Sequence, residues 1–219
     1  MSDREPATAR EPASMLSFAL DAPNLVSLAG LGSALVGVYF AIRGVLPAAM
    51  IGLVWAVVLD WTDGIVARRT PNRTAEQRSF GAQLDSLIDV VSFGVAPAIV
   101  LLAIGGFGAW FVPGAFLILA AAVIRLSHFN VFGLVGGSTY RGLALDNNVI
   151  VLAAVFALRP LVGAPLFVAI VYAVLAVLAV LNVAPIRTPK LAGGWYYAVI
   201  AFAVGMSAVF GWQLAAHLA

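Results

Sequence analysis

Four aspartates lie within apolar stretches of the chain, where an ionised side chain is costly. Asp60 and Asp63 are three residues apart, and Asp85 and Asp89 are four residues apart. Because an α-helix turns by about 100° per residue, each pair lies on one face of a helix. Two neighbouring helices are therefore expected to present paired carboxylates to a shared space.

The residues around these pairs indicate what the carboxylates would bind. With no cysteine in the chain, carboxylate oxygens favour magnesium, manganese or calcium and disfavour zinc. Gly64, Ala67 and Gly81 are small and lie on the same helix faces, which leaves room beside the acids. Arg68 adds positive charge suited to a phosphate. Two metal ions can clamp a pyrophosphate while a carboxylate accepts a hydroxyl proton, so this pattern favours phosphoryl transfer with a lipid-borne substrate.

Two other interpretations of the same aspartates stay open. In the first, the aspartates form an ion pathway in a divalent-cation or proton-coupled transporter. In the second, they pair with arginines and have a structural role only. A transporter would also need polar residues that continue to the opposite side of the bilayer. The outer halves of the stretches 47–68 and 80–104 are nearly all apolar.

The composition indicates that the helices carrying the aspartates span a membrane. Of the 219 residues, 63% are hydrophobic and only 10% are charged, and the mean hydropathy is +1.03. A soluble domain carries about 25% charged residues. The apolar runs are continuous rather than alternating, which predicts helices and not a β-barrel. We expect seven spans, at about residues 24–42, 47–68, 80–104, 111–132, 143–158, 165–184 and 194–214.

Changes in polarity predict the domain organisation and the orientation. Residues 1–22 are expected to form a disordered N-terminus and a possible interfacial helix, and residues 23–219 a single transmembrane catalytic domain. With the amino terminus in the cytoplasm, only Arg43 and Arg159 of the loop residues lie on the far side. Nine basic residues then lie on the cytoplasmic side: Arg4, Arg10, Arg68, Arg69, Arg73, Arg78, Arg141, Arg187 and Lys190. This asymmetry follows the positive-inside rule and places the acidic pairs near the cytoplasm.

The segments DWTDGIVAR (60–68) and GAQLDSLID (81–89) together resemble the signature of the CDP-alcohol phosphotransferase family. All eight signature positions are filled, by Asp60, Asp63, Gly64, Ala67, Arg68, Gly81, Asp85 and Asp89. The resemblance implies an all-α polytopic membrane protein with the family's six-helix core, to which the span count adds about one transmembrane helix. It also implies a transferase of phospholipid biosynthesis.

The resemblance implies a role for each signature residue. It implies two divalent metal ions, Mg²⁺ or Mn²⁺, bound by Asp60, Asp63, Asp85 and Asp89. It implies a cytidine nucleotide site formed by Asp60, Gly64, Ala67, Arg68 and Gly81. Asp89 would also be the catalytic base that takes the proton of the acceptor alcohol. The alcohol oxygen would attack the phosphate attached to the lipid, and CMP would leave.

Further segments look like the phosphatidylserine synthase branch of the family. They are PNLVS (23–27), QLDSLIDVVSFGVAPA (83–98), RLSHFNV (125–131) and IRTPK (186–190). This resemblance implies a CDP-diacylglycerol–serine O-phosphatidyltransferase-like enzyme that converts CDP-diacylglycerol and L-serine to phosphatidylserine and CMP. The stretch YRGLALDNNV (140–149) departs from the pattern of that branch. The same chemistry with inositol phosphate, glycerol phosphate or another head-group alcohol therefore stays open.

Polar residues near the cytoplasmic ends of the later spans are candidates for binding the acceptor or the lipid phosphate. They are Arg125, Asn130, Arg141, Asp146, Arg187 and Lys190. Asp146 could instead cap a helix where a span begins. Arg125 could instead extend its side chain to the membrane interface without binding a ligand.

The resemblance and the composition also predict the protein's surroundings. We expect an integral protein of a bacterial or archaeal cytoplasmic membrane, with its active site facing the cytoplasm. Its partners would be the lipid bilayer and, as is common in the family, a second copy in a homodimer. No nucleic acid partner is expected.

Overall fold

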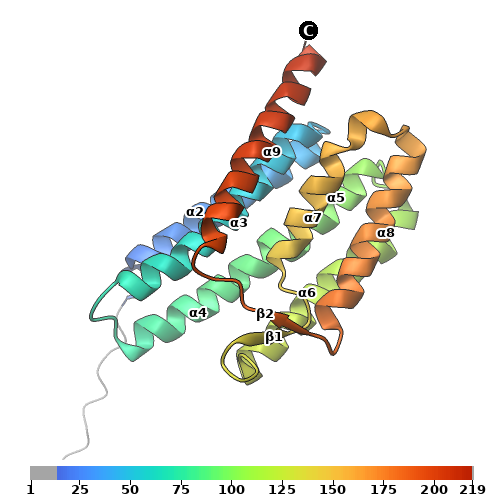
Figure 1. Ribbon diagram of the computed structural model, residues 1–219. Helices are drawn as coiled ribbons and strands as arrows, with labels where there is room; N and C mark the ends of the chain where they lie inside the picture. The colour runs from blue at the N-terminus through green and yellow to red at the C-terminus, as the bar shows by residue number, and fades with distance from the viewer. Residues whose placement is uncertain (1–13, 219) are drawn as a thin grey trace, which may run out of the picture.

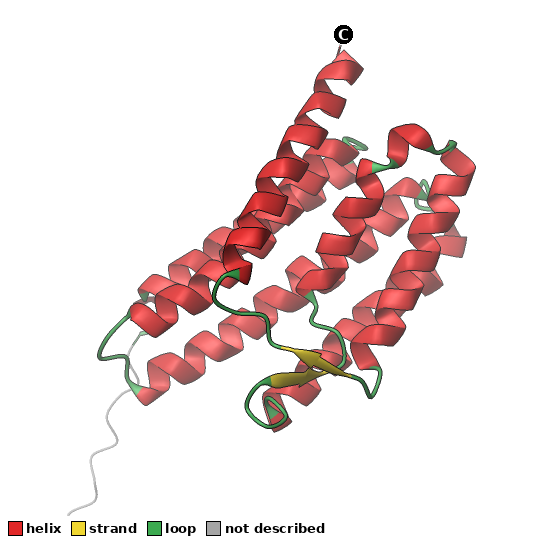
Figure 2. Cartoon of the chain, in the orientation of Figure 1, coloured by secondary structure: helices red, strands yellow, loops and turns green. Residues whose placement is uncertain are grey.

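The computed structural model describes residues 14–218, which form a bundle of helices joined by short connections (Figures 1 and 2). The helices are α1 (Met15–Ala19), α2 (Ala22–Ile42), α3 (Leu46–Arg69), α4 (Ala75–Asp89), α5 (Ala96–Ile104), α6 (Val112–Phe132), α7 (Asp146–Ala157), α8 (Ala164–Val183) and α9 (Trp195–Leu218). A π-helical segment, η1 (Val90–Val95), joins α4 to α5. Short 3-10 turns are η2 (Ala109–Phe111) and η3 (Arg159–Leu161), and two short strands are β1 (Thr139–Arg141) and β2 (Arg187–Pro189).

Six helical stretches of the described chain are long and apolar enough to span a membrane: five single helices, α2, α3, α6, α8 and α9, and the continuous stretch Ala75–Ile104 formed by α4, η1 and α5. The predicted all-α polytopic fold is thereby confirmed. The expected span at 143–158 differs, because its helix α7 has 12 residues. At about 1.5 Å per residue such a helix measures ~18 Å, less than the ~30 Å hydrocarbon core. In the part of the chain that the structure describes, α7 is the shorter apolar helix that accompanies the six spans.

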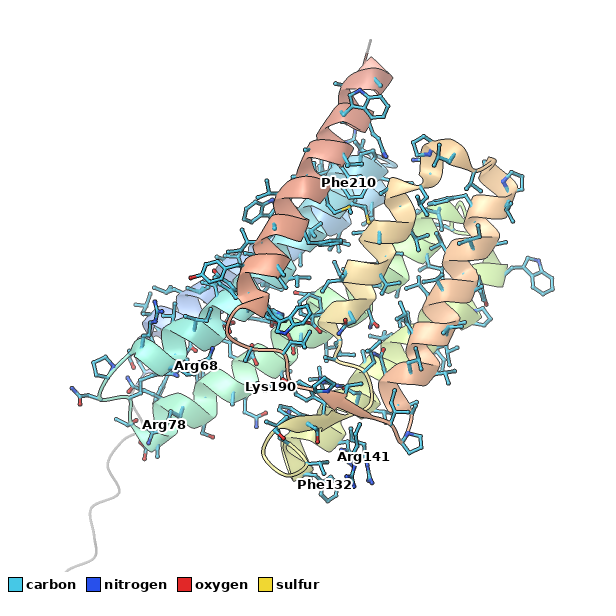
Figure 3. All side chains as sticks on the ribbon, viewed as in Figure 1. Arg68, Arg78, Phe132, Arg141, Lys190 and Phe210 are labelled. Atoms are coloured by element: carbon cyan, nitrogen blue, oxygen red, sulfur yellow. The ribbon has the colours of Figure 1, made fainter. Side chains whose placement is uncertain are left out.

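The connections alternate between the two ends of the bundle. The turn between α2 and α3 and the turn between α7 and α8 lie at one end, together with the end of α9 (Figure 1). The α3–α4 connection and both strands lie at the other end, which we call the polar end. Figure 3 places Arg68, Arg141 and Lys190 at the polar end and Phe210 toward the opposite end. The carboxyl end of α3 and the first turns of α4 therefore share one side of the bundle with the basic residues.

The connection from α3 to α4 is shorter than the polar sequence at 68–79 suggests. The Thr74 hydroxyl accepts a hydrogen bond from the Gln77 amide N–H, and the Gln77 side chain accepts one from the Thr74 N–H. This capping box starts α4 at Ala75. An ion pair of 2.6 Å between Arg73 Nε and Asp21 Oδ2 fixes the connection to the start of α2.

Helices α2 and α3 approach each other through glycines. A Cβ atom added at Gly52 would lie 2.8 Å from the backbone nitrogen of Gly37, closer than atoms can pack. Close backbone approach is a common way for membrane helices to associate, because lipid provides no hydrophobic force between them. The contact holds the aspartates of α3 in a fixed position relative to α2.

Asp89 is followed by a widened turn. The amide N–H of Ala96 donates to the carbonyl of Val91, five residues earlier, as in a π-helix. Pro97 has no N–H to donate to the Phe93 carbonyl four residues earlier. The buried Asn148 side chain of α7 donates to that carbonyl instead, over 3.0 Å. The change in helix geometry thus lies beside the acidic residues and is bonded to α7.

Two loops distant in the sequence pair as a small antiparallel ribbon. Strand β1 follows α6 and strand β2 follows α8, with Arg141 opposite Arg187. Gly142 adopts a φ of +78°, and a Cβ atom there would lie 2.0 Å from the carbonyl oxygen of Asn182. The ribbon is absent from the sequence prediction because three-residue strands carry almost no pattern of their own.

The predicted disorder of residues 1–13 falls outside the described part of the chain. The apolar patch that follows does form a helix, α1, started by Ser14, whose hydroxyl accepts from the Ser17 amide. Phe18 stacks on Phe80 of α4 at 5.3 Å between ring centroids. That α1 lies in the membrane surface remains a prediction.

Candidate active site and metal centre

Three of the four predicted aspartates meet between α3 and α4. Asp60, Asp85 and Asp89 each offer a carboxylate oxygen, and these oxygens all lie within 4.8 Å of one another. The helical spacing explains the arrangement, since Asp85 and Asp89 are one turn apart on α4 and face the last turns of α3. The expectation that both helices present their acids to one space therefore describes these three residues correctly.

Among the described residues, none of these carboxylates forms an ion pair with a basic side chain. Among residues 14–218 the only ion pair is the one between Arg73 and Asp21, at the helix start. Oδ1 of Asp89 is buried and has no hydrogen-bond partner. A buried, unpartnered carboxylate oxygen beside two further carboxylates requires a cation or a proton donor, and oxygen ligands suit a hard divalent ion. The residues present therefore fit a metal ion.

Asp63 lies outside this group of three. Its Oδ2 accepts a hydrogen bond of 2.5 Å from the Ser27 hydroxyl of α2, and its carboxylate interacts electrostatically with Asp85. Asp63 thus approaches the acids from the side of α2, and Asp85 connects it to the others. Ser27 was missed by the sequence prediction, because its relation to Asp63 depends on the packing of α2 against α3.

A tight pocket continues from the acids into the bundle. It is lined by Ser27, Gly30, Ala56, Asp60, Asp63, Ile88, Ser92 and Phe93. The Ser92 hydroxyl, in the π-helical segment, is buried without a hydrogen-bond partner. The pocket brings together helices α2 and α3 and the segment after Asp89.

The predicted nucleotide residues divide into two groups in the structure. A Cβ atom on Gly64 would lie 3.5 Å from the Arg68 guanidinium, with no other atom within 4 Å, so this glycine leaves open space beside the arginine. Gly81 instead allows tight packing, since a Cβ atom there would lie 2.8 Å from Arg73 and 2.9 Å from Asn24. Gly81 thus brings α4 close to α2.

Arg125 of α6 lies within electrostatic reach of the acids. It is only 7% exposed, and its Nε has no hydrogen-bond partner. Its guanidinium lies 5.0 Å from the ring centroid of Tyr140 and 5.6 Å from that of Phe129. It is close enough to Asp89 for an electrostatic interaction. Burial raises the pKa of the Tyr140 phenol to about 12, so its hydroxyl stays protonated at neutral pH.

Asp146, the first residue of α7, is tied to α3. Its Oδ2 accepts a hydrogen bond of 2.9 Å from the indole of Trp61, the neighbour of Asp60. Its Oδ1 accepts from the Asn147 backbone N–H at 3.0 Å and from the Asn147 side chain at 3.1 Å. Asp146 therefore accepts a hydrogen bond from a free backbone N–H in the first turn of α7. It also interacts electrostatically with Asp60 and Asp89. The sequence analysis missed Trp61 and Tyr140, because only the fold brings them to Asp146 and Arg125.

The remaining predicted residues lie at the polar end at different depths. Asn130 accepts a hydrogen bond of 3.0 Å from the Ser86 hydroxyl, which joins α6 to α4. Arg141 and Arg187 are exposed and opposite each other on the ribbon. Lys190 is also exposed and interacts electrostatically with Asp85. The ribbon and the residue after it therefore carry three exposed positive charges, of which Lys190 interacts with the acidic group.

Comparison with known proteins agrees with this geometry. The family model for CDP-alcohol phosphatidyltransferase matches residues 20–214. An archaetidylserine synthase of Methanothermobacter thermautotrophicus is 38% identical over 124 residues, covering 56% of this chain and 52% of the relative. A CDP-diacylglycerol–serine O-phosphatidyltransferase of Helicobacter pylori is 34% identical over 111 residues, covering 50% of this chain and 45% of the relative. The enzyme of that name from Mycobacterium bovis is 34% identical over 110 residues, covering 49% and 37%.

The matched part of the chain spans about half or less of the length of these curated relatives. The family match is broader, because it includes α2 through most of α9 and all the carboxylates of the site. With three of the signature aspartates gathered between α3 and α4 and this match over most of its length, the chain belongs to the CDP-alcohol phosphatidyltransferase family.

Proposed function

We propose that the protein transfers a phosphatidyl group from CDP-diacylglycerol to L-serine, giving phosphatidylserine and CMP. The observation that carries this proposal is the group of three carboxylates within 4.8 Å, lying on the signature positions of the family. Serine as the acceptor is supported by the names of the relatives, of which one is an archaetidylserine synthase and others are serine O-phosphatidyltransferases.

The aspartates would hold two divalent metal ions, Mg²⁺ or Mn²⁺. Asp60, Asp85 and Asp89 are close enough to share one ion, and Asp63 would join Asp85 at a second position. Bound metal ions would neutralise the pyrophosphate and the charge that develops on it during transfer. Ser27 would orient Asp63 through its short hydrogen bond.

Asp89 would act as the catalytic base. Its Oδ1 is buried and free of hydrogen bonds, so it can accept the proton of the acceptor hydroxyl. The serine oxygen forms a bond to the lipid-side phosphorus, and the bond from that phosphorus to the oxygen of CMP breaks. The electron pair of the broken bond leaves with CMP, and the hydroxyl proton passes to Asp89.

The protein's own groups would position the donor at the polar end. Arg68, with the open space beside Gly64 and Ala67, would hold the nucleotide, and Asp60 and Gly81 would complete its site. Arg141, Arg187 and Lys190 would attract the lipid phosphate, while Arg125, Asn130 and Asp146 would lie near the acceptor. We propose that this end faces the cytoplasm of a bacterium or archaeon, because the basic residues gather there. A homodimer, common in the family, is part of the proposal.

The direct test combines purified protein with CDP-diacylglycerol, L-serine and Mg²⁺ or Mn²⁺, and measures CMP and phosphatidylserine. Both products should appear together and depend on the metal ion. Glu76→Gln, which removes an exposed acid at the start of α4, serves as a control with unchanged activity. An absence of CMP with serine and every other small alcohol would refute the transferase.

The acceptor alternatives are separated by the same assay. Release of CMP only with inositol phosphate, glycerol phosphate or another alcohol would retain the transferase and reject serine. Family membership and the apolar outer halves of α3 and α5 favour transfer over cation or proton transport. Cation flux into sealed vesicles without any CDP-lipid would reverse that preference.

A further inference from the structure

Arg125 and Asp146 carry opposite charges and both interact electrostatically with Asp89, and neither forms an ion pair with another residue of the described chain, 14–218. Arg125 is 7% exposed, and its Nε has no hydrogen-bond partner. Asp146 accepts hydrogen bonds only from the neutral groups of Trp61 and Asn147 among the described residues. No ion pair within 4 Å joins Arg125 to an acid in residues 14–218.

The two charges nevertheless belong to one small region. Arg125 interacts electrostatically with Asp89 first and with Asp146 and Asp60 more weakly. Asp146 in turn interacts with Arg125, and with Asp60 and Asp89. A buried guanidinium with an unpaired nitrogen is costly, and so is a carboxylate that faces other carboxylates. A ligand carrying both signs of charge would relieve both costs at once.

We propose that Arg125 and Asp146 form a zwitterion site, in which Arg125 binds the carboxylate and Asp146 the ammonium group of an α-amino alcohol. This inference rests on the proposed transfer reaction and specifies how its acceptor is recognised. The hydroxyl of the bound amino alcohol then points toward Asp89, the proposed base. An acceptor with only one of the two charges leaves the other protein charge unpaired, so the site selects for the zwitterion.

The surrounding side chains hold both charges in place. The aromatic rings of Tyr140 and Phe129 lie 5.0 and 5.6 Å from the guanidinium carbon, and such cation–π contacts hold the group without using its N–H donors. The indole N–H of Trp61 fixes one oxygen of Asp146, and Asn147 fixes the other. Trp61 is thus a positioning residue that connects the acceptor site to Asp60, its neighbour in sequence.

The test compares three acceptors with the purified protein, CDP-diacylglycerol and Mg²⁺ or Mn²⁺. L-serine carries both charges, 3-hydroxypropanoate lacks the ammonium group, and ethanolamine lacks the carboxylate. The unmodified protein should strongly prefer L-serine. Asp146→Asn should raise the KM for L-serine about 10- to 100-fold, as expected for loss of a charged hydrogen bond. Its reaction with 3-hydroxypropanoate and its KM for CDP-diacylglycerol should change little.

Arg125→Gln provides the complementary measurement. It should raise the KM for L-serine over a similar range and leave the reaction with ethanolamine nearly unchanged. Because Arg125 is buried, CDP-diacylglycerol binding and the thermal midpoint report whether the variant is folded; if it is not, Asp146→Asn decides alone. Glu76→Gln is the matched control for loss of an acid and should leave the three-acceptor profile unchanged.

The outcomes separate this inference from the function on which it rests. No CMP from the unmodified protein with any alcohol would overturn the transferase, and the zwitterion site with it. Serine turnover with an Asp146→Asn variant that affects L-serine and 3-hydroxypropanoate equally would overturn the zwitterion site and leave the transferase intact. A preference of the unmodified protein for a singly charged or neutral acceptor would also overturn it.

Discussion

The donor half and the acceptor half that we propose for the site are built in different ways. The donor half consists of Asp60 and Asp63 on α3 with Asp85 and Asp89 on α4, all within thirty residues of sequence. The acceptor half joins Trp61 of α3, Arg125 of α6, Tyr140 of β1 and Asp146 of α7. Local helical periodicity defines the first, whereas the packing of four separate elements defines the second. Chemistry shared by a family can therefore stay fixed while the acceptor site changes.

The largest effect should come from removing the metal ions of the donor half. Chelation with EDTA should reduce CMP release to background, because four carboxylates without cations repel the pyrophosphate of the substrate. Adding excess Mg²⁺ or Mn²⁺ should restore the activity. The same treatment should leave the secondary structure measured by circular dichroism unchanged, and activity that persists after complete chelation would break the assignment of the donor half.

Asp89→Asn should have the next largest effect. Loss of a catalytic base typically costs about 10²- to 10⁴-fold in turnover, and the amide cannot accept the hydroxyl proton. Binding of CDP-diacylglycerol, measured by equilibrium titration with Mg²⁺, should be largely kept, since Asp60, Asp63 and Asp85 remain. Near-native turnover in this variant would mean that another group takes the proton.

Asn148→Leu tests the connection between the two halves. The Asn148 side chain of α7 donates to the Phe93 carbonyl in the segment that follows Asp89. Its loss should lower the free energy of unfolding by ~1 kcal/mol and reduce kcat several-fold. Asn182→Leu is a matched control, because Asn182 is also buried and donates to a backbone carbonyl, that of Leu143. Equal kcat in both variants would show that the two halves act independently.

The smallest effect should follow Trp61→Phe, which keeps an aromatic ring and removes the hydrogen bond to Asp146. Asp146 keeps its two hydrogen bonds from Asn147, so the loss of this one should cost about 1 kcal/mol and raise the KM for L-serine about fivefold. The kcat and the KM for CDP-diacylglycerol should stay the same, because Asp60 is unchanged. A fall in kcat with an unchanged KM for serine would place Trp61 in the donor half instead.

The difference between the halves also explains what could be read from the sequence. The spacing of Asp85 and Asp89 predicted a shared face of α4, because i and i+4 positions lie on one side of a helix whatever surrounds it. The expectation that two acidic helices share one space holds for these two residues and Asp60. The long apolar stretches predicted the spanning helices, because the length of apolar chain needed to cross a bilayer does not depend on the neighbouring helices. Asp63 was predicted to lie with the other acids. Its hydrogen bond to Ser27 could not be predicted, because that contact depends on how closely α2 approaches α3.

Features that depend on several elements were beyond the sequence. The pairing of β1 with β2 joins segments 46 residues apart and is only three residues long. The predicted span at 143–158 is the shorter helix α7, because Asp146, Asn147 and Asn148 form hydrogen bonds at its start instead of entering lipid. Arg125 and Asp146 were candidates from the sequence, and the structure places both within electrostatic reach of Asp89, but the relation between them required the fold.

The π-helical turn after Asp89 has a consequence for how such an enzyme changes over evolution. A turn that holds one more residue than an α-helical turn rotates everything downstream by about 100° while hardly altering the helix length. Before the turn, the acids of α4 face α3. After the turn, Phe93 and α5 face α7 with a different side than they would if the helix were α-helical throughout. Deleting one residue from this turn would keep every residue of the family signature in the sequence. It would nevertheless rotate the second half of the thirty-residue helical stretch and misalign its contacts with the neighbouring helices.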